Sequence, residues 1–280
     1  SDGHILIEGV PGVAKTLSAK LLAKSLAVPF SRLQFTPDLM PSDVLGTTVF
    51  NPRETEFQFR KGPVFSSVVL IDEINRAPAK TQSALFEVME ERQVTIDGNT
   101  YPMQLPFMVI ATQNPIEQEG TYRLPEAQLD RFLFKINVGY PSLEDEVTIL
   151  EKQQYETTGE QLKQVEAVLH SEDLLFFRQM VRKMIVEPKL LQYIAKIVGE
   201  TRKDAALYLG GSPRASLSIL QSSKALAGLR GRDFVIPDDI LTVIPPVLRH
   251  RIILTPEKEM EGVTPDEMIQ KIIDRVEVPR

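Results

Sequence analysis

An eight-residue segment near the start of the chain constrains its fold more than any other feature. A strand-like apolar run, residues 4–8, precedes this segment, and a helix-like stretch, residues 15–27, follows it. Backbone N–H groups of such a loop, together with a helix N-terminus, present partial positive charge to an anion. Strand, loop and helix therefore predict a phosphate-binding site. The segment consists of Gly9, Val10, Pro11, Gly12, Val13, Ala14, Lys15 and Thr16.

Two side chains at the end of this loop add specific chemistry. Lys15 supplies a full positive charge for phosphates, and the Thr16 hydroxyl is suited to ligate Mg²⁺. Ala14 stands where the usual pattern has its second glycine, and we expect its methyl group to be tolerated only if φ is negative there. A plain glycine-rich turn is the alternative, but the flanking strand and helix favour phosphate binding.

Strand-length apolar runs alternate with helix-like segments in the first half of the chain. This alternation predicts a parallel sheet with helices on both faces. Two stretches, residues 48–60 and 93–105, break the rhythm, and each is predicted to form a β-hairpin. The expected strands are residues 4–8, 31–35, 68–72, 108–113 and 132–138, and the expected helices are residues 15–27 and 78–92.

Helical periodicity replaces the strand pattern after Pro141. We therefore expect two domains, residues 1–140 and residues 141–280, the second being all-helical. Helix-capping residues, Ser142, Ser212 and Thr264, support three of its helices. The expected helices are residues 142–156, 171–183, 187–203, 212–229, 237–247 and 264–276.

Two carboxylates follow a continuous apolar run, residues 68–71. Such a run requires burial on both faces, so its carboxyl end is the expected ligand edge of an open sheet. Asp72 is suited to hold Mg²⁺ through water, and Glu73 to orient or deprotonate an attacking water. An acidic pair after a strand is usually a solvated loop, but the phosphate-binding loop upstream favours a metal and nucleotide site.

A polar amide, Asn114, ends the strand expected at residues 108–113 and precedes a proline. It is suited to position a water against a terminal phosphate. An asparagine that merely begins a turn is equally consistent with this pattern.

Five motifs together resemble those of the MoxR family of AAA+ ATPases, and the resemblance covers nearly the whole chain. An alanine at position 14 is typical of that family. The motifs are Gly-Val-Pro-Gly-Val-Ala-Lys-Thr at 9–16, Leu-Ile-Asp-Glu-Ile-Asn-Arg-Ala at 70–77, Ala-Thr-Gln-Asn-Pro at 111–115, Leu-Pro-Glu-Ala-Gln-Leu-Asp-Arg-Phe at 124–132 and Gly-Ser-Pro-Arg-Ala at 211–215.

The resemblance implies an AAA+ αβα sandwich with a five-stranded parallel sheet and a smaller all-helical lid domain. It implies ATP and Mg²⁺ as ligands, and ATP hydrolysis in a homo-oligomeric, six-membered ring. It assigns Asn114 as the first sensor, Arg131 as the arginine finger offered to a neighbour, and Arg214 as the second sensor. The two hairpins correspond to the family's insert in the second helix and its hairpin before the first sensor. The segment that normally helps to enclose the adenine would precede residue 1, so we assign no contacts to the base.

Composition narrows the cellular setting. The net charge of −6 provides no global attraction for nucleic acid or anionic lipid. The chain has no cysteine, no signal peptide at its start and no apolar run near the ~20 residues of a membrane span. We therefore expect a soluble, cytoplasmic protein without a membrane span.

Three functions compete once ATP binding is accepted. The first is chaperone-like remodelling or maturation of client proteins, in which relatives act with partners that carry a von Willebrand factor A domain. The second is a nucleic-acid motor, which needs Lys or Arg at its hairpin tips, whereas the tip at residues 97–99 has none. The third is a nucleotide-dependent scaffold, which would need neither Glu73 nor Asn114 nor Arg131. We favour the first.

Overall fold

The computed structural model describes residues 2–10, 12–114, 121–155 and 162–279, and the chain divides into two compact units. The sheet unit comprises His4–Leu124 and Ile136–Leu175. The helical unit comprises Ser1–Gly3, Pro125–Lys135 and Phe176–Arg280. The domain boundary expected after residue 140 is based on the change from strand to helix periodicity, whereas these units are defined by contacts. That boundary therefore stays a prediction.

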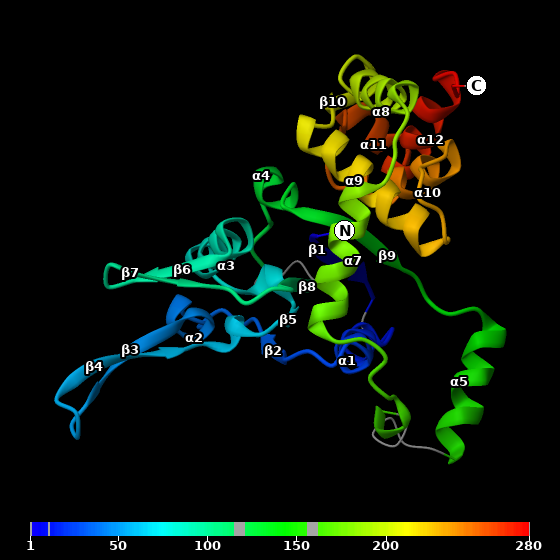
Figure 1. The fold of residues 1–280 in the computed structure, drawn as a ribbon. Coiled ribbons are helices and arrows are strands. Elements are labelled where there is room, and N and C mark those ends of the chain that lie inside the picture. Colours follow the sequence, from blue (N-terminus) through cyan, green and yellow to red (C-terminus); the bar gives the residue numbers. More distant parts are fainter. Residues whose placement is uncertain (1, 11, 115–120, 156–161, 280) are drawn as a thin grey trace. The chain divides into compact units, whose positions relative to one another are not determined.

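A five-stranded sheet forms the centre of the sheet unit, with the strand order β2-β5-β8-β1-β9 (Figure 1). The pairs β1 with β8, β2 with β5, and β5 with β8 are all parallel. The predicted five strands are therefore confirmed, with ends shifted by one residue at β1 and β2. The strands are β1 (His4–Gly9), β2 (Phe30–Gln34), β5 (Val68–Asp72), β8 (Met108–Gln113) and β9 (Phe132–Val138), and residues of β9 fall in both units.

Strand β5 is buried along its whole length between β2 and β8. Val69, Leu70 and Ile71 each have 0% exposure, which confirms the two-sided burial expected of this apolar run. Ile71 pairs with Ala111 of β8, so the two strands end at the same edge of the sheet. Asp72 and the residue after it are consequently delivered to that edge.

Helices of the sheet unit include one that the periodicity did not predict. Helix α2 has only five residues, too few for a 3.6-residue repeat to be recognised. The helix expected at residues 78–92 is α3, and its side chains Leu85, Phe86, Val88 and Met89 are buried. The helices are α1 (Lys15–Ser25), α2 (Pro41–Leu45), α3 (Ala79–Glu91), α5 (Leu143–Tyr155) and the 3-10 turns η1 (Pro63–Phe65) and η2 (Ile74–Arg76).

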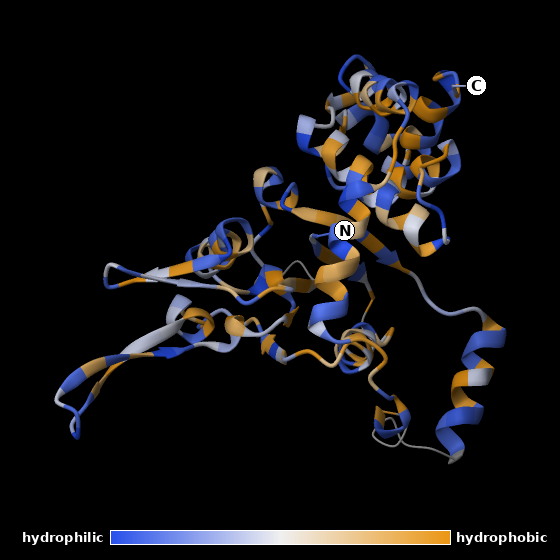
Figure 2. Cartoon of the chain, viewed as in Figure 1, coloured by the Kyte–Doolittle hydropathy of each residue, from blue (hydrophilic) through white to orange (hydrophobic). Residues whose placement is uncertain are grey.

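Helix α5 is amphipathic, as Figure 2 shows by its alternating hydrophilic and hydrophobic residues. Its apolar side chains are nevertheless exposed, with 78% for Leu143 and 67% for Leu150. The sequence pattern therefore predicts the helix correctly, whereas burial of its apolar face is not observed.

Both predicted β-hairpins are present and are braced against each other (Figure 1). The rings of Phe59 and Tyr101 lie 4.3 Å apart, and the Thr48 hydroxyl donates to an Asp97 carboxylate oxygen at 2.6 Å. The two insertions therefore form one double projection. The first hairpin consists of β3 (Gly46–Asn51) and β4 (Glu56–Lys61), and the second of β6 (Gln93–Ile96) and β7 (Asn99–Pro102).

Apart from α5, which belongs to the sheet unit, the predicted helices are confirmed in the helical unit, but this unit is not all-helical. Two short strands, β10 and β11, pair antiparallel, and short helix α11 follows them. Both strands are at most three residues long, too short to leave a period-2 pattern in the sequence. Among the described residues, no helix has the length and apolar character that crossing a bilayer requires. The elements are α4 (Glu126–Leu129), α7 (Ser171–Lys183, which spans both units), α8 (Pro188–Thr201), β10 (Leu207–Leu209), α9 (Pro213–Leu229), α10 (Pro237–Leu248), β11 (Ile253–Leu254), α11 (Pro256–Met260) and α12 (Pro265–Arg275).

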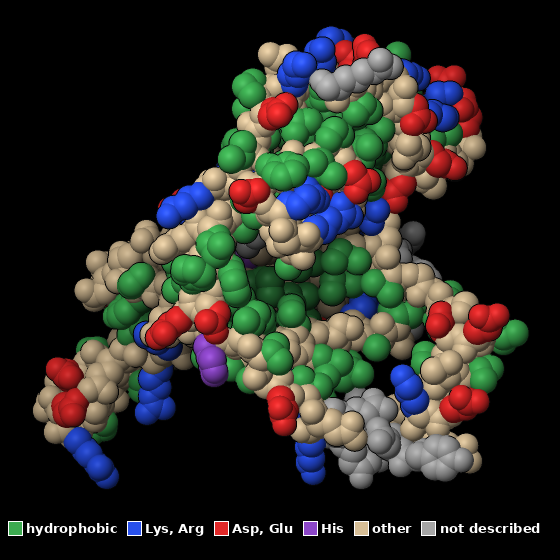
Figure 3. All heavy atoms as spheres, turned by 45° about the vertical axis from the view of Figure 1, so that its right-hand side comes forward, with side chains coloured by type: hydrophobic (Ala, Val, Ile, Leu, Met, Phe, Trp, Pro, Cys, Tyr) green, Lys and Arg blue, Asp and Glu red, His purple; other side chains and the backbone are tan. Residues whose placement is uncertain are grey.

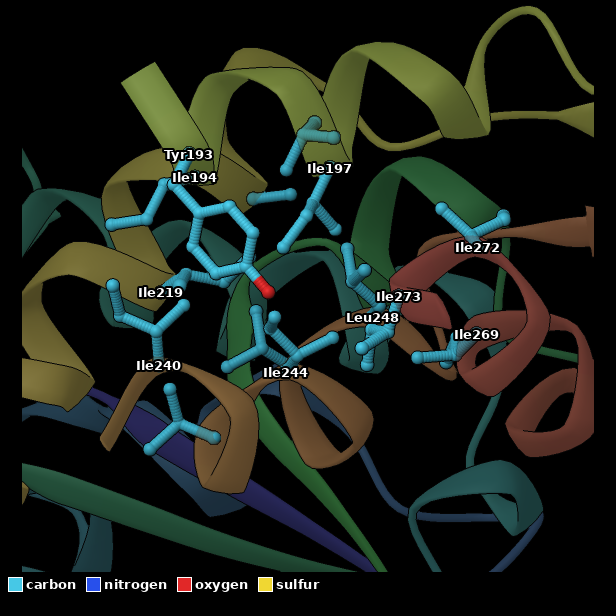
Figure 4. Packing of buried hydrophobic residues seen from close by; sticks show 14 of the residues in the cluster. Tyr193, Ile194, Ile197, Ile219, Ile240, Ile244, Leu248, Ile269, Ile272 and Ile273 are labelled. Carbon is cyan, nitrogen blue, oxygen red and sulfur yellow. The ribbon is translucent and has the colours of Figure 1, made fainter. Parts of the chain in front are cut away.

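An isoleucine-rich core joins α8, α9, α10 and α12 (Figure 4). Each fully buried side chain of this size stabilises the fold by about 1.5–3 kcal/mol relative to exposure. Tyr193 lies among these side chains, and burial raises the pKa of its hydroxyl. The labelled members are Tyr193, Ile194, Ile197, Ile219, Ile240, Ile244, Leu248, Ile269, Ile272 and Ile273.

A buried histidine, His250, follows α10. Its Nε2 lies 3.0 Å from the Phe132 carbonyl oxygen, which can only accept, so Nε2 carries the hydrogen. The pKa of His250 is lowered to about 3, first because burial disfavours the imidazolium and second because the Arg251 charge repels it.

This histidine should make folding sensitive to mild acid. Between about pH 6.5 and pH 3 the unfolded chain binds a proton that the folded chain does not, so the free energy of unfolding falls as pH falls. The loss should approach about 1.4 kcal/mol per pH unit, and it amounts to about 1.6 kcal/mol from pH 6.5 to pH 5. Urea unfolding of wild type and His250→Gln at both pH values measures it, because glutamine donates without titrating. Identical pH dependences in the two proteins would contradict the expectation.

Candidate nucleotide-binding site

The loop after β1 requires glycine at two positions for different reasons. A Cβ on Gly9 would lie 2.5 Å from the Val138 carbonyl oxygen, so close packing excludes a side chain. A Cβ on Gly12 would meet no atom within 4 Å, but its φ is +86°, which favours glycine. Val10 and Val13 are half-buried in the same loop, and Pro11 lies outside the described residues.

Ala14 corrects one expectation about this loop. Its φ is 55° and its ψ 24°, which is left-handed backbone, so the expectation of a negative φ was wrong. A non-glycine residue in this region costs about 1–2 kcal/mol. The methyl group is tolerated because the residue is exposed. The loop thus keeps the backbone shape that glycine provides in the usual pattern, at a cost in strain.

The N-terminus of α1 faces this loop without a side-chain cap. Ala14 is the N-cap residue and has no side chain that could accept from the first helical N–H groups. Those donors and the helix dipole are therefore suited to an anion. Lys15 begins the helix, and its Nζ donates to the Gly9 carbonyl oxygen at 2.6 Å, so its charge lies across the loop.

Asp72 is the centre of a polar cluster at the end of β5. The Thr16 hydroxyl lies 3.3 Å from Oδ1 and 3.4 Å from Oδ2 of this buried carboxylate. Thr112 of β8 donates to Oδ1 at 3.3 Å, and the Arg32 Nε donates to Oδ2 at 2.6 Å. The two residues predicted to hold Mg²⁺, Thr16 and Asp72, are thus adjacent. A hydroxyl and a carboxylate fit this ion, which prefers oxygen ligands and usually keeps water and phosphate as further ligands.

Glu73 is held by both its backbone and its carboxylate. Its φ is 57°, and its N–H donates to the Thr112 hydroxyl at 3.0 Å. Gln34 donates to Oε2 at 2.8 Å, and the Arg76 Nε lies 3.1 Å from the same oxygen. Because a left-handed glutamate is strained, the surrounding bonds must over-determine its position, as is common at functional sites.

Sequence reasoning did not single out Arg32, Gln34, Arg76 or Thr112. Arg32 and Gln34 are two positions apart along β2, so their side chains point to the same face of the sheet. Their polar character within an apolar strand is a signal, but the sequence does not show that β2 lies beside β5. The register, which pairs Gln34 with Asp72, supplies that information.

Asn114 follows β8 and is buried, with 6% exposure. Strand β8 lies between β5 and β1, so its carboxyl end lies between the acidic pair and the phosphate-binding loop. The structure therefore brings the loop, Thr16, Asp72, Glu73 and Asn114 to one edge of the sheet. The other two predicted residues belong to the helical unit: Arg131 is half-buried between α4 and β9, and Arg214 is exposed in the first turn of α9.

Two family matches cover both units. Residues 4–134 match the ATPase family associated with various cellular activities (AAA), and residues 199–272 match the AAA lid domain. A crystal structure of a candidate ATPase from Cytophaga hutchinsonii superposes with a TM-score of 0.90 and 44% identity, covering 99% of this chain and 86% of that one. Fold and site together define an AAA ATPase with its lid.

Relatives at higher identity narrow the class. Chaperone MoxR1 of Mycobacterium tuberculosis is 48% identical over 289 residues, which cover 100% of this chain and 75% of the relative. The Bacillus subtilis protein YeaC, described as uncharacterized, is 47% identical over 279 residues, with 100% and 86% covered. Protein MoxR of Methylorubrum extorquens is 29% identical, with 99% and 87% covered. The chain belongs to the MoxR family of AAA+ ATPases.

The strained alanine yields a test of the loop. Replacing Ala14 with valine should weaken ATP binding by about tenfold or more, because a β-branched residue resists the left-handed backbone. Ala14→Gly should bind ATP within about threefold of wild type. Calorimetric titration with ATP measures both.

A second left-handed alanine provides the matched control. Ala27, with φ 46°, lies beyond the other end of α1. Ala27→Val introduces similar strain away from the loop and should leave ATP affinity unchanged. Equal effects of the two valine variants on ATP affinity would refute the link between loop geometry and binding.

Proposed function

We propose that this ATPase binds and hydrolyses Mg·ATP at the carboxyl edge of its five-stranded sheet. The observation that carries the proposal is the contact between Thr16 and Asp72. These residues are 56 positions apart, yet the hydroxyl lies 3.3 and 3.4 Å from the two carboxylate oxygens. A phosphate-binding loop whose hydroxyl meets the acid of a buried strand is the arrangement that a phosphate-bound magnesium ion needs.

Each residue of the site has a separate task in this proposal. The loop and Lys15 bind the phosphates, and Thr16 and Asp72 hold the ion, which neutralises phosphate charge when bound. Glu73 accepts a proton from the attacking water, and Asn114 positions that water. Gln34 and Arg76 both engage Oε2 of Glu73, so we assign the water to the other oxygen, Oε1.

We further propose that hydrolysis drives chaperone-like remodelling of client proteins. One relative carries the name Chaperone MoxR1. The double hairpin supports a protein partner, because Phe50 and Phe57 are 46% and 74% exposed, with ring centroids 5.2 Å apart. Contact with Tyr101 of the second hairpin accounts for Phe59, whereas Phe50 and Phe57 contact each other and stay exposed. A von Willebrand factor A domain protein is the partner that the family resemblance suggests.

Surface charge gives less support to a nucleic-acid motor. Acidic and basic side chains are interspersed on the face drawn in Figure 3. The tip of the second hairpin carries Asp97, whose carboxylate accepts from Thr48. Binding of a phosphate backbone instead favours a continuous basic track.

We also propose a six-membered ring in which subunits share sites. Arg131 lies outside the sheet unit that contains the phosphate-binding loop, between α4 and β9. A guanidinium is suited to stabilise the charge on a neighbour's γ-phosphate. Arg214, exposed in the first turn of α9, is the second sensor in this proposal.

The chemistry is tested by removing the positive charge and the base separately. Lys15→Ala should abolish ATP binding. Glu73→Gln should bind ATP and lose turnover by about two orders of magnitude or more. Glu87→Gln makes the same chemical change on an exposed position of α3 and should keep wild-type turnover. Phosphate release and ATP titration measure these effects. Near-wild-type turnover in Glu73→Gln would contradict the assignment of Glu73 as the base.

The shared site is tested by mixing two inactive variants. Arg131→Ala should bind ATP and hydrolyse it about 10³-fold more slowly or worse. In mixed rings, the intact Arg131 of a Glu73→Gln subunit can face the intact Glu73 of an Arg131→Ala subunit, so activity should return. The ATPase rate is measured against mixing ratio, above the concentration at which light scattering shows assembly.

A flat rate in demonstrably mixed rings would contradict sharing unless all subunits must fire together. Titrating either variant into wild type separates these cases. A concerted ring loses activity far more steeply than in proportion to the inactive fraction.

A further inference from the structure

A buried arginine binds the segment that carries Arg131. The side chain of Arg251 is only 2% exposed, and its Nε donates to the Asp130 carboxylate at 2.6 Å. One terminal nitrogen, Nη2, lies 2.6 Å from the Phe132 carbonyl oxygen and 3.2 Å from that of Asp130. The other, Nη1, donates to the Leu133 carbonyl oxygen at 3.2 Å. One guanidinium therefore holds the backbone on both sides of Arg131, within the helical unit.

The neighbouring histidine strengthens the same attachment. The Phe132 carbonyl oxygen that Arg251 contacts also accepts from Nε2 of His250 at 3.0 Å. Both side chains come from the turn that follows α10. The backbone after Arg131 is thus held by two consecutive residues of a separate element.

Asp130 extends this network to the helix that carries Arg214. Its second carboxylate oxygen accepts from the Ser212 hydroxyl at 3.0 Å, and Ser212 is the N-cap residue of α9. Burial lowers the pKa of Arg251, the hydrogen bond and charge of Asp130 oppose that shift, and the Arg214 charge adds a smaller lowering. Asp130, the residue before Arg131, is therefore hydrogen-bonded both to Arg251 and to the segment that carries Arg214.

We propose that Arg251, through Asp130 and the flanking carbonyl groups, is the positioning residue for Arg131. The inference rests on the proposed function, in which Arg131 completes a neighbour's site. A finger residue gains from fixed geometry, since a misplacement of about 1 Å can cost about 10²-fold in rate.

A purely stabilising role explains Arg251 less well. Burying a guanidinium carries a large desolvation cost, and apolar residues of similar volume often stabilise a fold at least as well. The planar fork has five donors in fixed directions, and here it contacts Asp130, Phe132 and Leu133 together with the Val247 carbonyl oxygen at 2.6 Å. Such directionality fixes a backbone shape rather than merely filling space.

The test uses Arg251→Gln in the full chain. We expect ATP affinity within about threefold of wild type and a fall in kcat of about 10²-fold. Mixing with Glu73→Gln should restore activity, because the Arg251→Gln subunit keeps its own Glu73 and borrows an intact Arg131. Mixing with Arg131→Ala should restore nothing, because neither subunit then offers a working finger. A merely structural defect would not leave ATP affinity near wild type, and it would not be rescued by Glu73→Gln while remaining unrescued by Arg131→Ala.

Arg232→Gln is the matched control, because Arg232 pairs at 2.6 Å with Asp239, a carboxylate with 0% exposure in the same unit. It should lower the melting temperature while kcat stays near wild type. If Arg251→Gln does not fold, Asp130→Asn, which keeps the shape and removes the charge, should give the same mixing pattern.

Three results would overturn the proposal. One is unchanged kcat in a folded Arg251→Gln or Asp130→Asn. Another is that Glu73→Gln restores activity when mixed with Arg131→Ala but not when mixed with these variants. That result would leave the shared site intact and contradict only the role of Arg251. The third is that Glu73→Gln does not restore activity to Arg131→Ala in rings shown not to be concerted. That result would contradict both the shared site and this inference.

Discussion

The complete burial of β5 is the constraint on which the rest of the site depends. A five-residue strand with no exposed face must lie between two others, and β2 and β8 occupy those places. Because parallel strands end at a common edge, this position gives Asp72 three neighbours at once: Arg32 from β2, Thr112 from β8 and Thr16 from α1. Removing β5 from its place between β2 and β8 would break every one of these contacts.

Strain accompanies that arrangement at two points of the site. Ala14 and Glu73 both adopt left-handed backbone, which costs about 1–2 kcal/mol for each residue. Each lies directly beside another residue of the proposed site, Lys15 in one case and Asp72 in the other. The orientation of these two turns therefore lowers the stability of the fold. The hydrogen bond from Glu73 N–H to the Thr112 hydroxyl maintains one of them.

Much of this site could be predicted from the sequence because its residues follow strands. The run at residues 68–71 and the loop before Lys15 indicate both the elements and the edge where they meet. What could not be predicted depends on strand order and on contacts between distant segments. Gln34 reaches Glu73 only because β2 pairs with β5, and Arg251 reaches Asp130 across 121 positions. The sign of φ at Ala14 was predicted wrongly, because the loop shape outweighed the preference of the residue.

The brace between the two hairpins has a mechanical consequence. One hairpin follows α2, whereas the other connects α3 to β8, the strand that ends at Asn114. Because the rings of Phe59 and Tyr101 are in contact, with centroids 4.3 Å apart, the first hairpin cannot move separately from the second without breaking that contact. The chain thus runs directly from the double hairpin, through β8, to Asn114 at the ligand edge of the sheet.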